Sequence, residues 1–355
     1  MFAKPTLPAP LPSEIARPLL SAAERVAAFK PWEFMSDLEL IGLHDDRTGE
    51  LHVASVLGTL GTMFAVVIYR RDAGLRWIHE VATTRAAPDR YAGLENNDYL
   101  KVEWTKKGEL EKPDLQTLQT AGFRPAGKGS VWPRFETSQP GWYPWYITEA
   151  EAQLLTEHLR KVARFVHLRE RAGILHEEPI EDDVPVVPAG EESSLKPKDL
   201  EWVPLVPPPS PLPEPVILSA EEQEKLRSLP VRQNLVFEFV APLLTELSFI
   251  DESVGRPCIG RVAMMVERRS HLLLGTKLSH GAGPLRDAVG PALVKALSAA
   301  QALPSAIHVD TEAMAAALRP ACDVIGVPVR IARELNAAYE AVASLESDSG
   351  HAGQR

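Results

Sequence analysis

Three carboxylates in the C-terminal third of the chain have the residue type and placement for metal-assisted chemistry. Glu267 ends one apolar run, and Asp310 and Glu312 follow another. Carboxylates that converge at strand ends can hold two metal ions around a scissile phosphate. The same sequence also has a structural explanation, because Asp310 or Thr311 can cap the helix that begins there. These three acids are the catalytic candidates, with a local structural role as the alternative.

Rigid aromatic rings are concentrated in residues 130–147, SVWPRFETSQPGWYPWYI. Trp132, Trp142 and Trp145 lie within fourteen positions and alternate with prolines. Such rings can form a platform for a peptide, a base or a sugar. They can also fill the cleft between a sheet and the next helix, in a loop without regular backbone pairing. The three tryptophans are therefore the binding candidates, with core packing as the alternative.

The other sequence motifs that could support catalysis or metal binding are incomplete. The chain has two cysteines, Cys258 and Cys322, which excludes a disulfide scaffold and a cysteine-based zinc finger. We find no metal-ligand set, no nucleophile with a visible base and no phosphate-binding loop. We therefore expect no cofactor and no metal, and the pattern leans away from an enzyme.

Apolar periodicity and capping residues predict an N-terminal α+β module. Thr148 followed by Glu151 is a capping box that starts a long helix, and Gly122 ends a short one. The remaining elements expected before that helix are a helix at 13–29, a hairpin at 38–57, a strand at 63–70, a helix at 72–84 and a strand at 99–105.

The C-terminal part predicts a small α/β module of order ββαβαβα. A hairpin at 261–279 comes first, and helices then alternate with strands. Such alternation places at least part of the sheet in parallel pairing. This order resembles part of the ribonuclease H-like fold, although the hairpin is a strand short and its first strand lacks a central aspartate.

A proline-rich acidic segment separates the two modules. Residues 176–225 contain 11 of the 31 prolines, 13 carboxylates and 3 lysines. Proline is excluded from helix interiors and like charges repel, so we expect an extended spacer. The predicted division is an N-terminal helix (1–29), an aromatic-rich module (30–175), the linker (176–225), an aliphatic module (226–345) and a disordered tail (346–355).

The charge and hydropathy of the chain indicate which cellular compartment and which classes of partner to expect for the protein. The net charge of −10 equals that of residues 176–225 alone, so the rest of the chain sums to zero. A general nucleic-acid surface is therefore not favoured. Residues 53–69 lack charge, but glycines and threonines interrupt them, which favours two buried strands over a membrane span. With no signal-peptide pattern, we expect a cytoplasmic protein.

Two regions resemble uncharacterised bacterial families. The N-terminal motif is Trp132-Pro133-x-Phe135 followed by Pro140-Gly141-x-x-Pro144-Trp145-x-Ile147, within a resemblance that spans about residues 30–170. Residues 256–345 resemble a second such module. Neither resemblance implies an activity or catalytic residues.

The sequence therefore favours a non-enzymatic binding or scaffold protein. The alternative is a metal-dependent ribonuclease H-like nucleic-acid enzyme, either active or degenerate. The partner is not identified, and another protein is one candidate.

Overall fold

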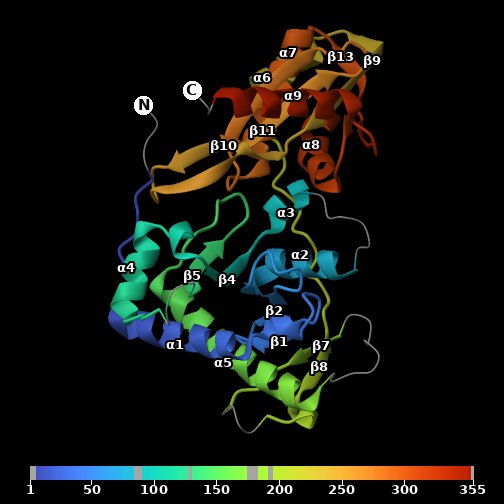
Figure 1. Cartoon of the computed structure of the whole chain (residues 1–355). Helices are drawn as coiled ribbons and strands as arrows, with labels where there is room; N and C mark the ends of the chain where they lie inside the picture. Colours follow the sequence, from blue (N-terminus) through green and yellow to red (C-terminus); the bar gives the residue numbers. More distant parts are fainter. Residues whose placement is uncertain are drawn as a thin grey trace. The chain divides into compact units, whose positions relative to one another are not determined.

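The computed structural model of the chain contains two compact units (Figure 1). It describes residues 5–83, 90–125, 127, 130–173, 183–190 and 195–352. The N-terminal unit comprises the described residues of Thr6–Pro140 and Pro144–Ser210. The C-terminal unit comprises those of Gly141–Tyr143 and Pro211–Arg355. Each unit has its own sheet and its own core.

The N-terminal unit combines helices with a mostly antiparallel sheet. Its helices are α1 (Ser13–Phe29), α2 (Arg71–Thr83), α3 (Arg90–Asn96), α4 (Lys112–Ala121) and α5 (Glu149–Ala172). Its strands are β1 (Ile41–His44), β2 (Leu51–Leu57), β3 (Ala65–Tyr69), β4 (Tyr99–Thr105), β5 (Trp132–Ser138), β6 (Trp145–Tyr146), β7 (Asp183–Val186) and β8 (Glu201–Pro204). Among the described residues these strands form one sheet of order β6-β5-β4-β3-β2-β1-β7-β8.

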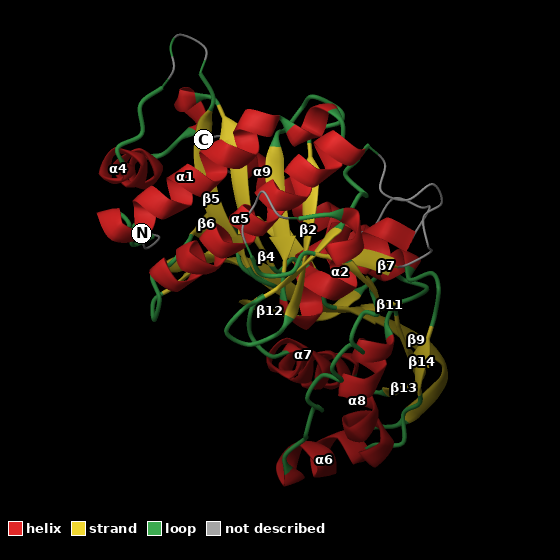
Figure 2. Ribbon diagram, turned by 90° about the horizontal axis from the view of Figure 1, so that it is seen from below, coloured by secondary structure: helices red, strands yellow, loops and turns green. Residues whose placement is uncertain are grey.

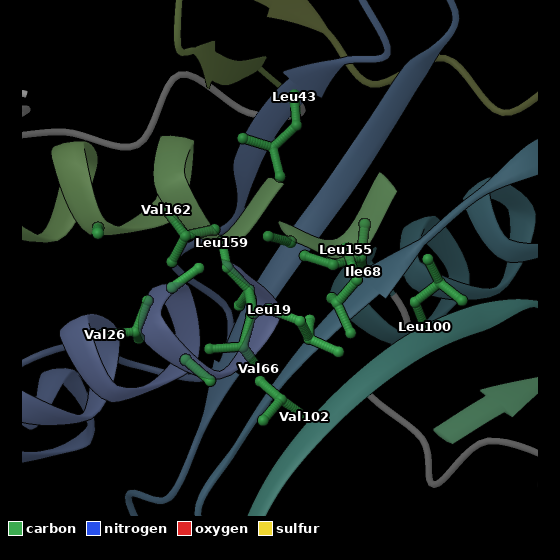
Figure 3. Close-up of a cluster of buried hydrophobic side chains, with 14 of the residues drawn as sticks. Leu19, Val26, Leu43, Val66, Ile68, Leu100, Val102, Leu155, Leu159 and Val162 are labelled. Carbon is green, nitrogen blue, oxygen red and sulfur yellow. The ribbon is translucent and has the colours of Figure 1, made fainter. Parts of the chain in front are cut away.

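One face of this sheet is covered by α1 and α5, which pack against each other. Leucine and valine side chains from both helices meet those of the central strands, as Figure 3 shows for Leu19, Leu159 and Val66. Alternation along the strands sends neighbouring residues to opposite faces. The opposite face carries a smaller core in which Val67 and Tyr69 of β3 lie with Ile78 of α2. The central strands are therefore buried on both faces.

The start of α5 follows from local sequence. The Thr148 hydroxyl accepts the Glu151 N–H, and the Glu151 carboxylate accepts the Thr148 N–H. This reciprocal pairing satisfies two backbone donors that a helix start leaves free. The predicted capping box is present, and it also fixes the position of the Glu151 side chain.

The C-terminal unit is an α/β sheet with helices beside it (Figure 2). Its helices are α6 (Ala220–Arg227), α7 (Leu285–Ala300), α8 (Glu312–Val324) and α9 (Asn336–Ala352). Its strands are β9 (Val231–Val240), β10 (Leu243–Asp251), β11 (Arg256–Glu267), β12 (Leu273–His280), β13 (Leu303–Val309) and β14 (Val329–Ile331).

Two strands that the sequence analysis did not predict, β9 and β10, complete the C-terminal sheet. Strand β11 pairs antiparallel with β9 and β12, whereas β13 is parallel to β9 and β14 is parallel to β13. Strand β10 also pairs antiparallel with β11, so the sheet has the order β10-β11-β9-β13-β14, and β12 joins it through β11. Strand β9 precedes the predicted hairpin in the chain and pairs with its first strand, β11. Its side chains Phe237 and Phe239 enter an aliphatic core with α7 and α8.

Three expectations about irregular segments differ from the structure. Residues 132–138 are not a loop, because β5 pairs along its full length with β4. The predicted spacer at 176–225 includes β7 and β8 of the N-terminal sheet and α6 of the C-terminal unit, and its residues 176–182 and 191–194 lie outside the described residues. The tail predicted as disordered contributes residues 346–352 to α9. Proline tolerates an edge position in a sheet, which is how Pro204 is accommodated in β8, the edge strand beside β7.

The predicted fold class is confirmed: an α+β unit precedes an α/β unit. The uncharged run at 53–69 forms β2 and β3, which pair as an antiparallel hairpin. Within the described ranges, no helix combines the length and the apolar character that spanning a bilayer requires.

Candidate functional site

Each of the three predicted catalytic carboxylates has a local structural partner. Glu267 is buried and accepts the Ser270 N–H at 2.7 Å, which closes the turn after β11. Asp310 accepts the Tyr339 hydroxyl at 2.8 Å, and exposed Glu312 pairs with the Arg319 guanidinium at 2.6 Å. The residue that caps α8 is Thr311. Of the predicted alternatives, the geometry favours local structural roles.

The acid on the central strand is Glu238 of β9, which the sequence analysis missed. It is 1% exposed, accepts the Ala338 N–H at 3.1 Å and lies 3.4 Å from the Arg268 guanidinium. Glu238 lies opposite His308 of β13, so it faces α9 rather than the aliphatic core. Within the described ranges, no group of three or more His, Cys, Asp or Glu residues could hold a metal ion.

The three candidate tryptophans have separate environments. Trp132 begins β5, where its ring contacts Phe123 at 4.9 Å between centroids. Trp145 lies opposite Thr137, toward the other end of that strand. Trp142 belongs to the C-terminal unit, where it forms an antiparallel bridge with Cys258. Trp132 and Trp145 therefore lie toward opposite ends of β5, and Trp142 belongs to the other unit.

A different set of polar residues converges at one end of the N-terminal sheet. Arg70 follows β3 and is 4% exposed. Its Nε donates to Asp98 Oδ1 at 2.9 Å, and its Nη2 donates to Glu151 Oε1 at 2.8 Å. The same Nη2 donates to the Thr137 hydroxyl at 2.8 Å. These contacts tie together the ends of β3 and β5 and the starts of β4 and α5.

Arg71 makes a second, two-pronged contact with the same carboxylate. Its Nε lies 2.6 Å from Asp98 Oδ2 and its Nη2 lies 2.7 Å from Oδ1. Arg71 has φ of +53°, a left-handed conformation that non-glycine residues rarely adopt. Such strain persists where the surroundings hold it in place, often at binding sites. Buried Asp98 supplies that restraint here.

The ionic groups of this network compensate one another. Arg70 and Arg71 contribute two positive charges, and Asp98 and Glu151 contribute two negative charges. Burial alone would raise the pKa of Glu151, but the Thr148 N–H and the Arg70 guanidinium outweigh it and the pKa is lowered. A buried ion pair is tolerated only when its members are paired and hydrogen-bonded, as these are.

A cavity of about 580 Å³ opens beside the network. Its volume is in the range of sites that hold small molecules. Arg71 and Asp98 line it from the network, and the first turns of α2 supply most of the remainder. The lining residues are Glu50, Leu51, Arg71, Asp72, Ala73, Leu75, Arg76 and Asp98.

Two buried histidines lie behind the cavity wall. His52 Nδ1 and His158 Nε2 are 2.8 Å apart, so one ring donates a proton and the other accepts it. Burial lowers the pKa of His52 to about 4 and that of His158 to about 3. Both rings are therefore neutral near pH 7. His52 Nε2 lies 3.9 Å from the carboxylate of Glu50, which lines the cavity.

Sequence reasoning missed this site because its members carry no local signature. Arg70-Arg71 follows an apolar strand and Asp98 precedes another, which is where charged residues commonly end strands. Arg70 and Asp98 are 28 positions apart in the sequence, and the antiparallel pairing of β3 with β4 brings them together. The sequence did show an arginine pair where a strand meets a helix. That pattern indicates a site only weakly unless the pairing of β3 with β4 is known.

The fold and the site define a two-module protein with a charged cavity in its N-terminal unit. Residues 17–181 match the family model of a domain of unknown function (DUF7309). Residues 222–346 match that of a second domain of unknown function (DUF6930). The chain therefore joins two domains of unknown function, which confirms the expected two-module resemblance. Neither a curated protein nor a solved structure matches the chain.

Proposed function

We propose that the protein is a cytoplasmic, non-enzymatic binding protein whose N-terminal unit holds a small ligand in the cavity beside Asp98. The observation that carries this proposal is the conformation and position of Arg71. Its backbone is strained, its guanidinium is held from one side by a buried carboxylate, and it lines a cavity of ligand size.

The charge arrangement supports binding in preference to catalysis. Asp98 is committed to two guanidinium groups, and Glu151 is committed to Arg70 and to the start of α5. A carboxylate held in this way is a poor proton acceptor, whereas a pre-positioned guanidinium is well suited to recognise an anionic group. Recognition of this kind needs little rearrangement on binding.

The cytoplasmic assignment rests on the cysteines and the sequence pattern. Cys258 and Cys322 are both buried and free. Burial raises the pKa of Cys322 to about 12, which makes it an inert core thiol. Unpaired thiols are typical of a reducing compartment. Within this proposal the C-terminal unit serves as a second interaction module.

A stabilisation screen tests the proposal. Full-length protein is heated with each member of a set of small polar metabolites, and the unfolding midpoint is recorded. We expect at least one compound to raise the midpoint by several degrees, because a ligand that binds the folded state stabilises it. The Arg71→Gly variant should lose this stabilisation.

Two features make the variant informative. Glycine adopts positive φ without strain, so Arg71→Gly removes the guanidinium while relieving the backbone. Loss of the ion pair with Asp98 lowers its unfolding midpoint and relief of the backbone raises it, so ligand stabilisation is taken for each protein as the difference between its midpoints with and without the compound. Arg160, an exposed arginine of α5, provides the matched control Arg160→Gln, which should respond like the wild type. Equal stabilisation of wild type and Arg71→Gly would contradict the proposal, as would a set without any stabilising compound.

A further inference from the structure

The cavity contains charges that the Arg70–Asp98 network leaves uncompensated. Asp72 lines the cavity and, in the part of the chain that is described, makes no ion pair. Glu50 lines it with a carboxylate that is 63% exposed and whose nearest basic group is the His52 ring. Because that ring is neutral near pH 7, it does not compensate the Glu50 charge.

Arg76, which lines the same cavity, makes fewer hydrogen bonds than its guanidinium can donate. The Nη1 of Arg76 donates weakly to the Pro209 carbonyl at 3.4 Å. Within the described ranges its Nε is buried and has no hydrogen-bond partner. Among the described residues Arg76 has no ion-pair partner, so its charge is left for an anionic ligand group. Arg71 adds a second positive group, since Asp98 occupies one edge of its guanidinium.

These leftover groups have both signs, which limits the class of ligand. A phosphate or another dianion would be repelled by Asp72 and Glu50. A simple amine would be repelled by Arg71 and Arg76. The first turn of α2 adds partial positive charge near Arg71, which favours an anionic group at that position. A ligand with one anionic and one cationic group satisfies both sets.

We propose that this cavity binds a small zwitterion of the amino-acid or dipeptide class. Its carboxylate would be held by Arg76 and by the free edge of Arg71. Its ammonium group would be held by Asp72 and Glu50. A charge-assisted hydrogen bond is roughly twice as strong as a neutral one, so the two ends together provide affinity and orientation. This inference rests on the proposed function, because it names the ligand class of the same cavity.

Calorimetric titration of the full-length protein with four probes tests the ligand class. The probes are L-alanyl-L-alanine, its N-acetyl form, its C-terminal amide and inorganic phosphate. We expect the free dipeptide to bind at least ten-fold more tightly than either blocked form. Each blocked form lacks one charge and leaves the opposing protein groups unpaired.

Two single variants assign the two ends of the ligand. Arg76→Gln should weaken binding of the free dipeptide and remove the difference between it and the amide. Asp72→Asn should remove the difference between the free dipeptide and its N-acetyl form. Arg160→Gln, which changes an arginine outside the cavity, should leave every affinity unchanged.

Three results would overturn the ligand class: equal affinity for the free and blocked dipeptides, tighter binding of phosphate, or no binding of the free dipeptide at millimolar concentration. The stabilisation screen separates this failure from that of the proposed function. If a compound of another class stabilises the wild type and not Arg71→Gly, the cavity binds ligand and only the zwitterion is wrong. If no compound does so, both are wrong.

Discussion

At the scale of single residues, Asp98 organises the candidate site. Its carboxylate is 5% exposed and lies between the Arg70 and Arg71 guanidinium groups. Removing one partner from a buried ionic network leaves the other charges uncompensated, which costs more than the pair itself contributes. Arg70 would be most affected, because it is almost fully buried and has no route to solvent.

Asp98→Asn should therefore destabilise the protein by about 3–5 kcal/mol. The measurement is the free energy of unfolding of the full chain in urea. Asp72→Asn is the matched control, since it makes the same chemical change at an exposed aspartate of the same cavity and should change stability by less than about 0.5 kcal/mol. Similar losses in the two variants would mean that Asp98 has no special structural role.

The buried histidine pair makes stability depend on pH. In the folded protein the pKa values of His52 and His158 are about 4 and about 3, below the ordinary value of 6.5. Burial is the main cause. The positive charge of Arg70 also opposes protonation of His52, and His52 and Lys161 oppose protonation of His158. The unfolded chain thus binds more protons below pH 6.5, which favours unfolding there.

We expect full stability above about pH 6.5 and a progressive loss toward pH 4. Each unit of pKa shift corresponds to at most about 1.4 kcal/mol per histidine. Unfolding measured from pH 8 to pH 4.5 checks this, and His158→Gln should give a shallower dependence because one titrating ring is gone. An unchanged slope in His158→Gln would show that other groups cause the effect.

At the scale of elements, the site depends on how closely α2 packs against the start of β4. A Cβ atom added at Gly74 would lie 2.3 Å from the Asp98 carbonyl oxygen, which is too close for the backbone to remain in place. Helix propensity alone would make alanine more stable than glycine here by about 1 kcal/mol. For the replacement of Gly74 by alanine, packing therefore predicts a lower stability of the folded protein and helix propensity predicts a higher one.

Gly74→Ala should lower the unfolding midpoint and abolish ligand stabilisation, because Asp98 and Arg71 would be displaced together. Gly108 offers the control, since a Cβ atom there meets nothing within 4 Å. The checks are thermal unfolding with and without the stabilising compound. A more stable Gly74→Ala protein would mean that α2 does not contact β4 as described.

Elements with local signals were predictable from the sequence, and those set by distant partners were not. The capping box at Thr148 and the alternating strand 99–105 were predicted at their observed positions. Strand β5 was missed because Trp132, Pro133 and Phe135 are typical of loops as well as strands. Its pairing is decided by β4, which lies before a helix and a long connection.

The proposed site was even less predictable from the sequence than strand β5. The candidates taken from sequence, Glu267, Asp310 and Trp142, were selected for residue type, and in the structure each contacts a different partner. The Arg70–Asp98 network was invisible because its chemistry lies in a tertiary contact between common residues. A binding site formed by ordinary charged residues cannot be identified before the strand register is known.

At the scale of the whole molecule, two different domains provide two different interiors. The N-terminal core includes Trp104 and Phe135 and lies mainly between the sheet and two long helices. The C-terminal core is built largely from alanine, leucine and valine around Phe237 and Phe239. This contrast agrees with the predicted aromatic-rich and aliphatic modules. The cavity belongs entirely to the N-terminal unit, so its ligand need not involve the second domain.

The most direct test of a ligand site beside Asp98 is the NMR spectrum of the arginine Nε–Hε groups in the full-length protein. The spectrum is recorded with and without the compound that stabilises the protein most. We predict that the Arg71 and Arg76 signals shift on binding while that of Arg160 does not. Shifts confined to arginines of the C-terminal unit, such as Arg319, would contradict the account.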